Sequence, residues 1–316
     1  MPSKKKLYAK KLNEIVRRFG SMESETVRRA MEMLRQLQNQ IAGELLRADG
    51  VTSFTAFRLK ELSANLERMI QEYERQLMAL AGESLRDGYT LGTQSVTEPL
   101  AAAGFQAAFF QPSQAQVNVL LDFSADLIKN ITSGMLSKIN TQIRIAALGN
   151  RSTMDAMQEI TRILGLKAGK KMTATGIAYR AEMIFRTETM RAFSLATQSQ
   201  QNASAQLFPG LQKQWVATGD GRTRASHLAA HGQVVDVDKP FVVGGAELMH
   251  PHDPAGPASQ TINCRCRTVT IHPEIGAIAS PLDERIQKEK ERREESLNVG
   301  RLESAERRRP WNVIFR

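Results

Sequence analysis

Two residue classes are scarce in this chain of 316 residues: it has two cysteines, and aromatic residues make up only 6%. Cys264 and Cys266 are separated by one residue, which is poor geometry for a disulfide between them, so reduced thiols fit better than a disulfide-stapled secreted scaffold. No apolar run is long enough to span a bilayer, and the basic N-terminus lacks the apolar stretch of a secretory signal. We therefore expect two reduced thiols in a cytoplasmic setting.

Helix-forming residues and positive charge are what the chain has in excess. Ala, Leu, Met, Gln, Glu and Arg abound, which favours helices, and a hydrophobic content of 41% is enough for a packed core. The formal net charge is +10 and the sequence pI is about 9.8. This balance predicts association with something acidic, such as nucleic acid, a membrane surface or an acidic protein face.

Apolar residues recur at steps of three and four over the first hundred residues, and this period predicts two long helices. The first covers about 8–48. The second follows a cap at Ser53, and we expect it to weaken at Gly88 and Gly92 and to close at Pro99. Because each helix carries one apolar stripe, the pair is expected to form an antiparallel hairpin.

The same period continues beyond the hairpin. Ser113 is expected to cap a third long helix that ends near Gly149. A shorter helix over Thr153–Leu164 follows, then a basic loop over 167–175, and then a further helix over about 174–205.

The composition of the sequence changes at Pro209. From there on, turns rich in Gly, Pro and Asp separate short β-prone runs. A short helix over 222–231, capped by Thr223 or Ser226, is expected among them. After Pro281 the chain becomes a charge-dense helix. The expected strands are Gln214–Ala217, Val234–Val237, Phe241–Val243 and Arg267–Ile271.

Together these elements predict an α+β fold that is mostly α. A long helical hairpin or bundle body is followed by a small α+β module with short antiparallel strands and by a charged C-terminal helix. The expected parts are an N-terminal helical hairpin for docking at 1–112, a helical body at 113–208, the small module at 209–280 and a charged helical tail at 281–316.

The small module also concentrates the residues that carry chemistry, because four of the five histidines and both cysteines lie between Trp215 and Cys266. Cys264 and Cys266 share one face of an extended strand, and His227 and His231 share one face of a helix. A strand with this C-x-C pair opposite such a helix predicts a tetrahedral Cys₂His₂ zinc site. Two further histidines, at positions 250 and 252, are rival ligands.

Two other interpretations of this cluster stay open. The first is a small polar core with two buried free thiols, since free cysteine often behaves as a small hydrophobe. The second is nucleophilic or metal-dependent chemistry, most plausibly a hydrolase or nuclease built on His227, His231 and the cysteines.

The D-G-R-T-R run that begins at Asp220 predicts a tight turn, in which the Asp220 side chain bonds to the amides two residues on. Arg222 is expected to bridge Asp220 or Asp253, with phosphate binding as the functional alternative. On the preceding helix, Glu188 and Arg191 are three residues apart and share a face, so we expect a salt link that ties this helix to the module.

Basic residues at both ends of the chain are candidates for contact with a nucleic acid backbone, and solvated tails are the alternative. No aromatic platform or reading helix accompanies them, so any binding is expected to be independent of sequence and sensitive to salt. The candidates are Lys4, Lys5, Lys6, Lys10, Lys11, Arg307, Arg308 and Arg309.

Five features follow one another along the chain: R-T-E on a helix, a Trp-led β segment, D-x-R-T-x-x-x-H, D-P and a closing N-C-R-C. Their order resembles that of the head-morphogenesis family of tailed bacteriophages, the minor head proteins like protein F of phage Mu. The resemblance runs over about 178–271. Thr261 and Ile262 stand where many members have a histidine and a proline. The matching positions are Arg186, Thr187, Glu188, Arg191, Trp215, Asp220, Arg222, Thr223, His227, Gly232, Asp253, Pro254, Asn263, Cys264, Arg265 and Cys266.

This resemblance implies a structural protein of low copy number and not an enzyme. Such a protein would lie inside the phage head near the portal, after assembly in the host cytoplasm, and would assist head assembly, DNA packaging or genome delivery. The implied partners are the portal protein, a scaffold or major capsid protein, and packaged double-stranded DNA bound without sequence specificity, with no membrane. An adaptor that makes no DNA contact is a further alternative. Zinc is the one cofactor that the residues suggest.

Overall fold

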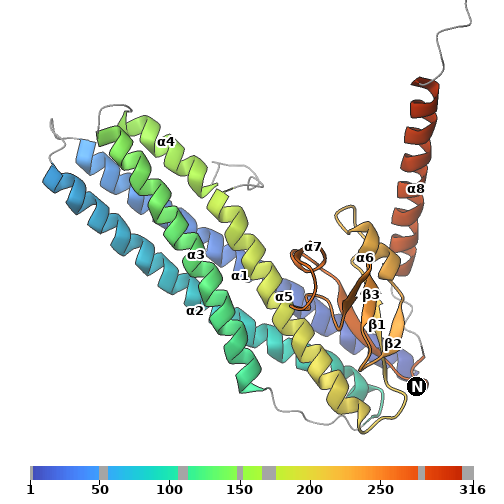
Figure 1. The fold of residues 1–316 in the computed structure, drawn as a ribbon. Coiled ribbons are helices and arrows are strands. Elements are labelled where there is room, and N and C mark those ends of the chain that lie inside the picture. Colours follow the sequence, from blue (N-terminus) through green and yellow to red (C-terminus); the bar gives the residue numbers. More distant parts are fainter. Residues whose placement is uncertain are drawn as a thin grey trace, which may run out of the picture.

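The computed structural model describes residues 3–49, 56–105, 113–147, 152–165, 176–276 and 282–307. It has the predicted architecture: a long helical bundle leads to a small α+β module, from which a final helix projects (Figure 1). The mostly α, α+β fold class is therefore confirmed. The bundle helices are α1 (Lys4–Asp49), α2 (Ala56–Ala102), α3 (Gln114–Ala147), α4 (Thr153–Leu164) and α5 (Gly176–Ala205).

The apolar stripes of all five bundle helices meet in one core. Each helix contributes fully buried side chains to it, and the burial of each large aliphatic side chain stabilises the fold by about 1.5–3 kcal/mol. The core therefore crosses the junction at residue 112 between the expected hairpin and the helical body. Representative members are Leu34, Leu77, Met135, Ile160 and Ile177.

Helix α2 runs through Gly88 and Gly92, where it was expected to weaken, and ends at Ala102, three residues beyond Pro99, where it was expected to close. Gly88 and Gly92 lie on one face of α2, where the backbone of α5 packs. A methyl group on Gly92 would lie 2.2 Å from the carbonyl oxygen of Phe193, and one on Gly88 would lie 2.9 Å from that of Thr189. The glycines thus permit a close helix crossing. Pro99 lies in the last turn of α2.

The start of α3 has the expected cap, and α4 is capped at both ends. Ser113 precedes α3, and its hydroxyl accepts a hydrogen bond from the Gln116 amide at 3.4 Å. Ser152 caps α4 through the Asp155 amide at 3.1 Å, and Gly165 ends that helix in the left-handed conformation at φ 73°. The expected cap at Ser53 and the basic loop over 167–175 lie outside the described residues.

The module is built on a three-stranded antiparallel sheet with the order β2-β1-β5 and a two-stranded hairpin, β3-β4. Gly244 and Gly245 form the turn of the hairpin with φ of 60° and 82°, which only glycine adopts readily. The strands are β1 (Gln212–Val216), β2 (Val234–Asp236), β3 (Phe241–Val243), β4 (Ala246–Leu248) and β5 (Arg267–Ile271), and the helices are α6 (Ala225–Ala230) and α7 (Ala258–Thr261).

Strands β3 and β5 have the predicted bounds, whereas β1 begins two residues earlier than expected. β4 and α7 were not predicted, because three or four residues are too few to establish a period. The N-cap of α6 is Arg224, which makes no side-chain capping bond. Neither Thr223 nor Ser226 is therefore the cap that was expected.

The module packs on the N-terminal end of α1, the C-terminal end of α2 and one side of α5. Tyr8 of α1 is fully buried and donates a hydrogen bond to the Thr270 carbonyl of β5 at 3.0 Å. From α5, Gln201 donates to the Thr270 hydroxyl at 3.1 Å. Val96 and Val269 belong to the hydrophobic cluster at this interface.

Helix α8 (Leu282–Arg307) leaves the module and points away from the bundle (Figure 1). Its first turns are anchored by buried Ile286, which packs on Gly219, and by Arg293, which donates to the Thr223 carbonyl at 2.8 Å. Among the helices of the described ranges, none combines the length and the apolar character needed to cross a bilayer.

Gly92→Ala is expected to lower the free energy of unfolding by about 1–3 kcal/mol or more, because the added methyl group meets the Phe193 carbonyl and overpacks the α2–α5 contact. Gly134→Ala in α3 is the control, because nothing lies within 4 Å of its added methyl group. It should stabilise the protein by up to about 1 kcal/mol. Urea unfolding of the two variants checks this, and equal stabilities would contradict the close crossing.

Candidate functional site

His227, Cys264 and Cys266 meet in the interior of the module. The Nδ1 atom of His227 lies 3.3 Å from the Cys266 sulfur and 3.6 Å from the Cys264 sulfur. The three possible ligand atoms lie within 4.8 Å of one another, and the three residues are 1–3% exposed. The expected meeting of the C-x-C pair with a histidine is therefore present in the structure.

Short local elements produce this arrangement. Helix α6 turns His227 inward, where its ring makes an edge contact with Trp215 of β1 at 5.8 Å between centroids. Asn263 lies in the left-handed conformation at φ 55° and starts the extended segment that leads into β5. Its amide donates to the Thr187 hydroxyl of α5 at 3.1 Å. The R-T-E and N-C-R-C motifs are thus in contact.

The protonation of His227 follows from its second contact. Its Nε2 lies 3.0 Å from the side-chain oxygen of Gln260, which also accepts a hydrogen bond from the Ser226 hydroxyl at 2.9 Å. Because this oxygen can only accept, Nε2 carries the proton and donates it. Nδ1 therefore presents its lone pair to the two sulfur atoms, which is the form of histidine that binds metals.

The pKa values of the two thiols are shifted in opposite directions. The hydrogen bond with Cys266, above all, holds the pKa of the Cys264 thiol well below its usual range, whereas the pKa of Cys266 is raised. The Cys266 amide also points at the Cys264 sulfur, at 3.4 Å. Such donors stabilise a thiolate at Cys264 relative to one at Cys266.

His231 does not join this cluster, so its expected position as a ligand was wrong. Helix α6 ends at Ala230, and His231 has non-helical angles, φ −59° and ψ 132°. The spacing of four residues therefore does not place it beside His227. Its Nδ1 instead accepts a hydrogen bond from the Ala217 amide at 3.2 Å.

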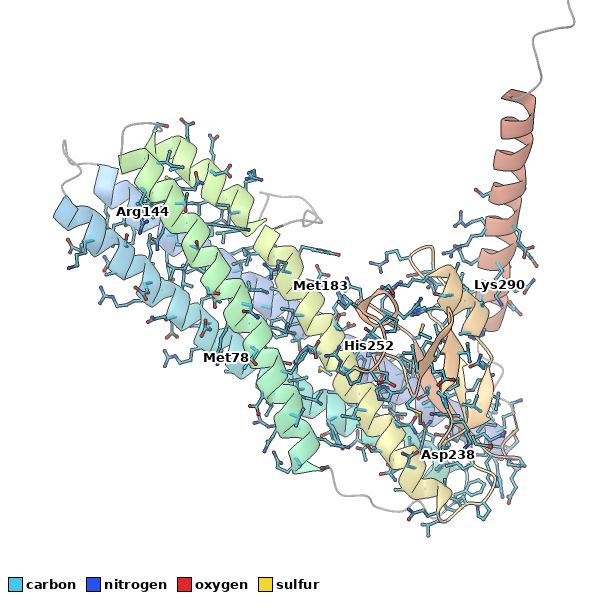
Figure 2. All side chains as sticks on the ribbon, viewed as in Figure 1. Met78, Arg144, Met183, Asp238, His252 and Lys290 are labelled. Carbon is cyan, nitrogen blue, oxygen red and sulfur yellow. The ribbon has the colours of Figure 1, made fainter. Side chains whose placement is uncertain are left out.

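His252 lies next to the cluster instead, between α5 and the module (Figure 2). Its side chain is fully buried and contributes to the lowered pKa of Cys264. Its backbone lies in the left-handed region at φ 64°, an uncommon conformation for a residue other than glycine. Neither ring nitrogen has a hydrogen-bond partner among the described residues.

Glu188 and Arg191 form a buried link between α5 and this loop. The Arg191 guanidinium donates to Glu188 at 2.6 Å and to the His252 carbonyl at 3.2 Å. Burial raises the pKa of Glu188, and the charge of Arg191 opposes that shift. The salt link from this helix to the module is thus present, as expected from the spacing of the two residues.

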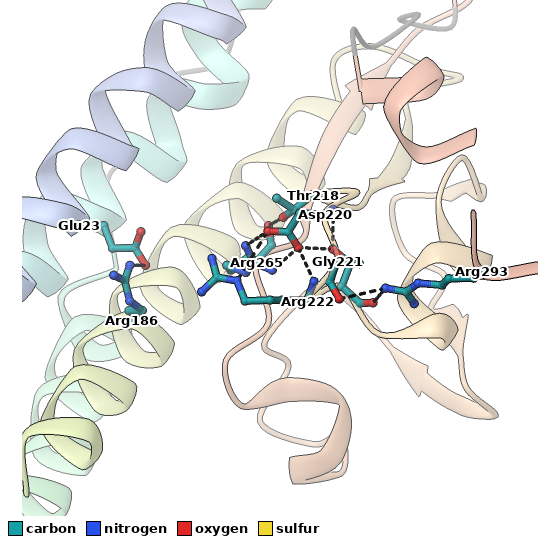
Figure 3. A network of polar contacts seen from close by, with 9 residues as sticks. Glu23, Arg186, Thr218, Asp220, Gly221, Arg222, Arg265 and Arg293 are labelled. Carbon is teal, nitrogen blue, oxygen red and sulfur yellow. Dashed lines mark hydrogen bonds and ion pairs between the residues drawn. The ribbon is translucent and has the colours of Figure 1, made fainter. Parts of the chain in front are cut away.

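The D-G-R-T turn holds the other side of the module. Asp220 accepts a hydrogen bond from the Arg222 amide at 3.1 Å, as predicted, and another from the Thr223 hydroxyl at 3.0 Å. Its charge partner is Arg265, whose two terminal nitrogens lie 2.5 and 2.6 Å from the carboxylate oxygens (Figure 3). This bidentate pair holds the pKa of Asp220 well below its usual range.

Arg222 was expected to bridge Asp220 or Asp253, and the structure places it in a long ion pair with Asp220. Its side chain is 82% exposed, and its nearest Asp220 oxygen lies 3.8 Å away. Asp253 instead accepts hydrogen bonds from the amides of Met249 and Ala255, at 2.8 and 2.9 Å, and so closes its own turn.

Arg186 points away from the module, toward α1. It pairs with Glu23 at 3.3 Å and with Glu182 at 2.8 Å (Figure 3). This residue of the R-T-E motif therefore holds α5 to the bundle, whereas the neighbouring Thr187 holds α5 to the module.

The basic N-terminal residues divide into paired and exposed ones. Lys4 pairs with Glu274 at 2.7 Å, and Lys11 pairs with Glu98 at 3.1 Å and with Glu14 at 3.3 Å. Lys5, Lys6 and Lys10 are exposed on α1. At the other end, Arg308 and Arg309 and the side chain of Arg307 lie outside the described part of the chain.

Two features escaped the sequence reasoning. Lys213 stands between Gln212 and Gln214 in β1, yet it is fully buried and donates to Gln198 of α5 and to the Met249 carbonyl at 2.8 and 2.7 Å. Burial lowers its pKa to about 8. The second feature is an apolar groove of about 420 Å³ between α3, α5 and the loop at His250, which exposed Val119 and Phe123 help to line.

The arrangement favours a closed, structural role for the cysteines. Both thiols are buried under the strands and α6, which keeps a substrate from reaching a sulfur nucleophile. The groove lies on the side where Arg191 and His250 meet α3, and its lining is almost entirely apolar. Such a surface suits a protein contact better than bond-breaking chemistry.

Comparison with known proteins gives one family and two curated relatives. Residues 127–269 match the family described as Phage Mu protein F like protein. The Mu-like prophage FluMu F protein of Haemophilus influenzae is 35% identical over 96 residues, which are 30% of this chain and 20% of that protein. The NAD(+)--arginine ADP-ribosyltransferase EFV of Enterococcus faecalis is 28% identical over 183 residues, which are 54% of this chain and 37% of that protein. The chain thus spans well under half of either relative. No solved structure matches.

Asp220→Asn is expected to cost about 2 kcal/mol of unfolding free energy at pH 7, because it removes a charge-assisted pair at 2.5 and 2.6 Å. The folded pKa of Asp220 is depressed, so its contribution is present above its unfolded pKa of about 3.9 and is lost as pH falls below that value. Urea unfolding should therefore show a smaller difference in unfolding free energy between wild type and Asp220→Asn at pH 3 than at pH 7.

The control for this measurement is Arg222→Ala in the same turn. Its exposed side chain should change stability by no more than about 0.5 kcal/mol at either pH. If the loss of unfolding free energy in Asp220→Asn were the same at pH 7 and pH 3, the charge pairing would be contradicted.

Proposed function

We propose, from the match of residues 127–269 to the family described as Phage Mu protein F like protein, that this chain is a low-copy, non-enzymatic component of a tailed-phage head. It binds at the portal vertex and assists head assembly, DNA packaging or genome delivery. The observation that carries this proposal is the family match, which covers α5 and the module up to β5, where the R-T-E and N-C-R-C motifs meet.

An enzymatic role has less support. The Enterococcus faecalis relative is named for ADP-ribosyl transfer, but the aligned region is 37% of that protein, and the activity in its name belongs to the whole relative. A metal-dependent hydrolase or nuclease at His227 and the cysteines needs an open metal position reachable by water and substrate. The burial of all three residues argues against one.

The apolar groove beside α3 is the surface that we propose for the portal protein. Val119 and Phe123 are 68% and 47% exposed, and they lie on the same helix next to a concave, almost wholly apolar lining. Exposed apolar patches next to such a concavity mark protein contact surfaces. The dimensions of the groove suit side chains of a partner helix laid along it. Scaffold or major capsid protein are the other head partners in this proposal.

The test of the whole proposal is the composition of phage heads. In heads purified from the phage that encodes it, the chain should be present at a few copies per head, and its absence would refute the proposal. A Val119→Ser/Phe123→Ser double variant should be incorporated several-fold less. Val242→Ser is the matched control, since Val242 is 54% exposed but lies on the β3–β4 hairpin. Equally reduced incorporation of the control would exclude the groove as the docking surface.

We further propose that the exposed lysines of α1 contact the backbone of packaged DNA. Lys5→Ala/Lys6→Ala/Lys10→Ala should weaken binding to a double-stranded DNA fragment and flatten its salt dependence, by about 0.9 in log–log slope for each phosphate that is no longer neutralised. Lys11→Ala is the control, because Lys11 is already paired with Glu98 and Glu14. Wild-type protein that binds no DNA at low salt, or binds it independently of salt, would favour the adaptor without DNA contact.

A further inference from the structure

We propose that Cys264, Cys266, His227 and His252 hold one Zn²⁺ ion that ties together α6, the turn at His252 and the segment that leads into β5. This site differs from the Cys₂His₂ set that the sequence suggests, since His252 replaces His231. It does not depend on the proposed role in the phage head, because it rests only on the geometry of the module.

The first support is the spacing of the three assembled ligand atoms. In a tetrahedral site with Zn–S of about 2.3 Å and Zn–N of about 2.0–2.1 Å, a sulfur and a nitrogen ligand lie about 3.6 Å apart. The two sulfur–Nδ1 distances here are 3.3 and 3.6 Å. Both sulfur–nitrogen distances are thus close to those of a tetrahedral site, and the three ligand atoms lie within 4.8 Å of one another.

The second support is the orientation of the first histidine. Gln260 accepts the Nε2 proton of His227, so the free lone pair of Nδ1 faces both sulfurs. Zinc-bound histidines commonly donate their other ring N–H to an oxygen in this way, which fixes both the tautomer and the ring plane. Ser226 in turn holds Gln260 at 2.9 Å.

The third support is the state of His252. A buried polar group without a partner destabilises the folded state, and both nitrogens of this fully buried ring lack a hydrogen-bond partner among the described residues. His252 acts on the Cys264 thiol but lies outside the three ligand atoms that are within 4.8 Å of one another, so coordination requires its ring to move toward them, which breaks no existing hydrogen bond of the ring. The strained φ of 64° and the hydrogen bond from Arg191 to the His252 carbonyl hold the residue there.

The other histidines near the module are already engaged or turned away. Nδ1 of His231 accepts from the Ala217 amide, and His250 has a ring nitrogen 2.8 Å from the Pro251 carbonyl. A polar core of thiols and one imidazole accounts for the contacts of Cys264, Cys266 and His227. It leaves His252 unexplained, and a fourth metal ligand at this position accounts for it.

A zinc ion here would join three segments that are far apart in the sequence: α6, the turn at His252 and the start of β5. Because a preformed site does not exist in the unfolded chain, the free energy of metal binding becomes folding free energy of the module. With four protein ligands the coordination sphere is closed, which is the pattern of a structural site and leaves no position for a reacting water.

The first experiment uses the full wild-type chain purified without chelator. Elemental analysis should give about one zinc per chain. Replacement of the bound zinc by Co²⁺ should give the visible absorption of tetrahedral cobalt, together with a sulfur-to-metal charge-transfer band. Strong chelation should lower the melting temperature, and added zinc should restore it. A folded chain that carries no zinc and takes up no Co²⁺ overturns the proposal.

Variants then test the ligand set. Cys264→Ser should abolish the charge-transfer band or reduce it strongly. His252→Ala should weaken Co²⁺ binding by more than about tenfold, since even the removal of an outer-sphere partner commonly costs that much. His231→Gln is the matched control and should keep metal content and spectrum unchanged.

His252→Cys guards against simple unfolding of the alanine variant. If His252 is a ligand, this change supplies a third thiolate and the charge-transfer band should intensify. An unchanged band, or equal metal affinity in His252→Ala and wild type, would show that His252 is not a ligand and would overturn the proposed set.

Discussion

The packing of α5 against both the helical bundle and the module is the constraint on which the rest of the structure depends. Most residues of this helix are buried, including many polar ones. On one side it crosses α2 so closely that Gly88 and Gly92 leave no room for a side chain. On the other it presents Thr187, Arg191 and Gln201 to the module. A helix with two buried sides must satisfy its polar groups through its neighbours, and the module supplies those partners.

This constraint explains why the motif residues are spread over the chain and yet form one unit. Thr187 accepts a hydrogen bond from the Asn263 amide, and Arg191 donates one to the His252 carbonyl. Both of these module residues have positive φ, so both loops are held in uncommon conformations by contacts with the same helix. The left-handed turn at Asn263 aims the two cysteines at His227, and the turn at His252 brings a second imidazole beside them. The position of the Cys/His cluster is thus a consequence of helix packing.

The sequence predicts the elements better than the contacts between them. Periodic apolar positions identify the long helices, because burial of a stripe imposes that period on α1, α2 and α3. The same local reasoning fails at Gly92 and Pro99. At Gly92 the helix continues because its glycine permits close packing against α5, and Pro99 is accommodated because it lies in the last turn of α2. At the site, the alternation of Cys264 and Cys266 is a local property and was predictable. His231 was misplaced because α6 stops one residue too early. His252 and the Asp220–Arg265 pair depend on loop conformation and on contacts across more than forty residues, for which a single sequence carries no signal.

The divergence of the bundle and α8 gives the molecule two arms that start from the same small body. The 46-residue α1 extends about 70 Å at 1.5 Å per residue, and α8 departs from the other side of the module in a different direction (Figure 1). Gly219 leaves the space that the first turn of α8 occupies, because a side chain at this position would collide with Ile286. Two binding surfaces carried on these arms could be occupied at once by neighbours that never touch each other, and the angle between those neighbours would be set by the few side chains at the base of α8.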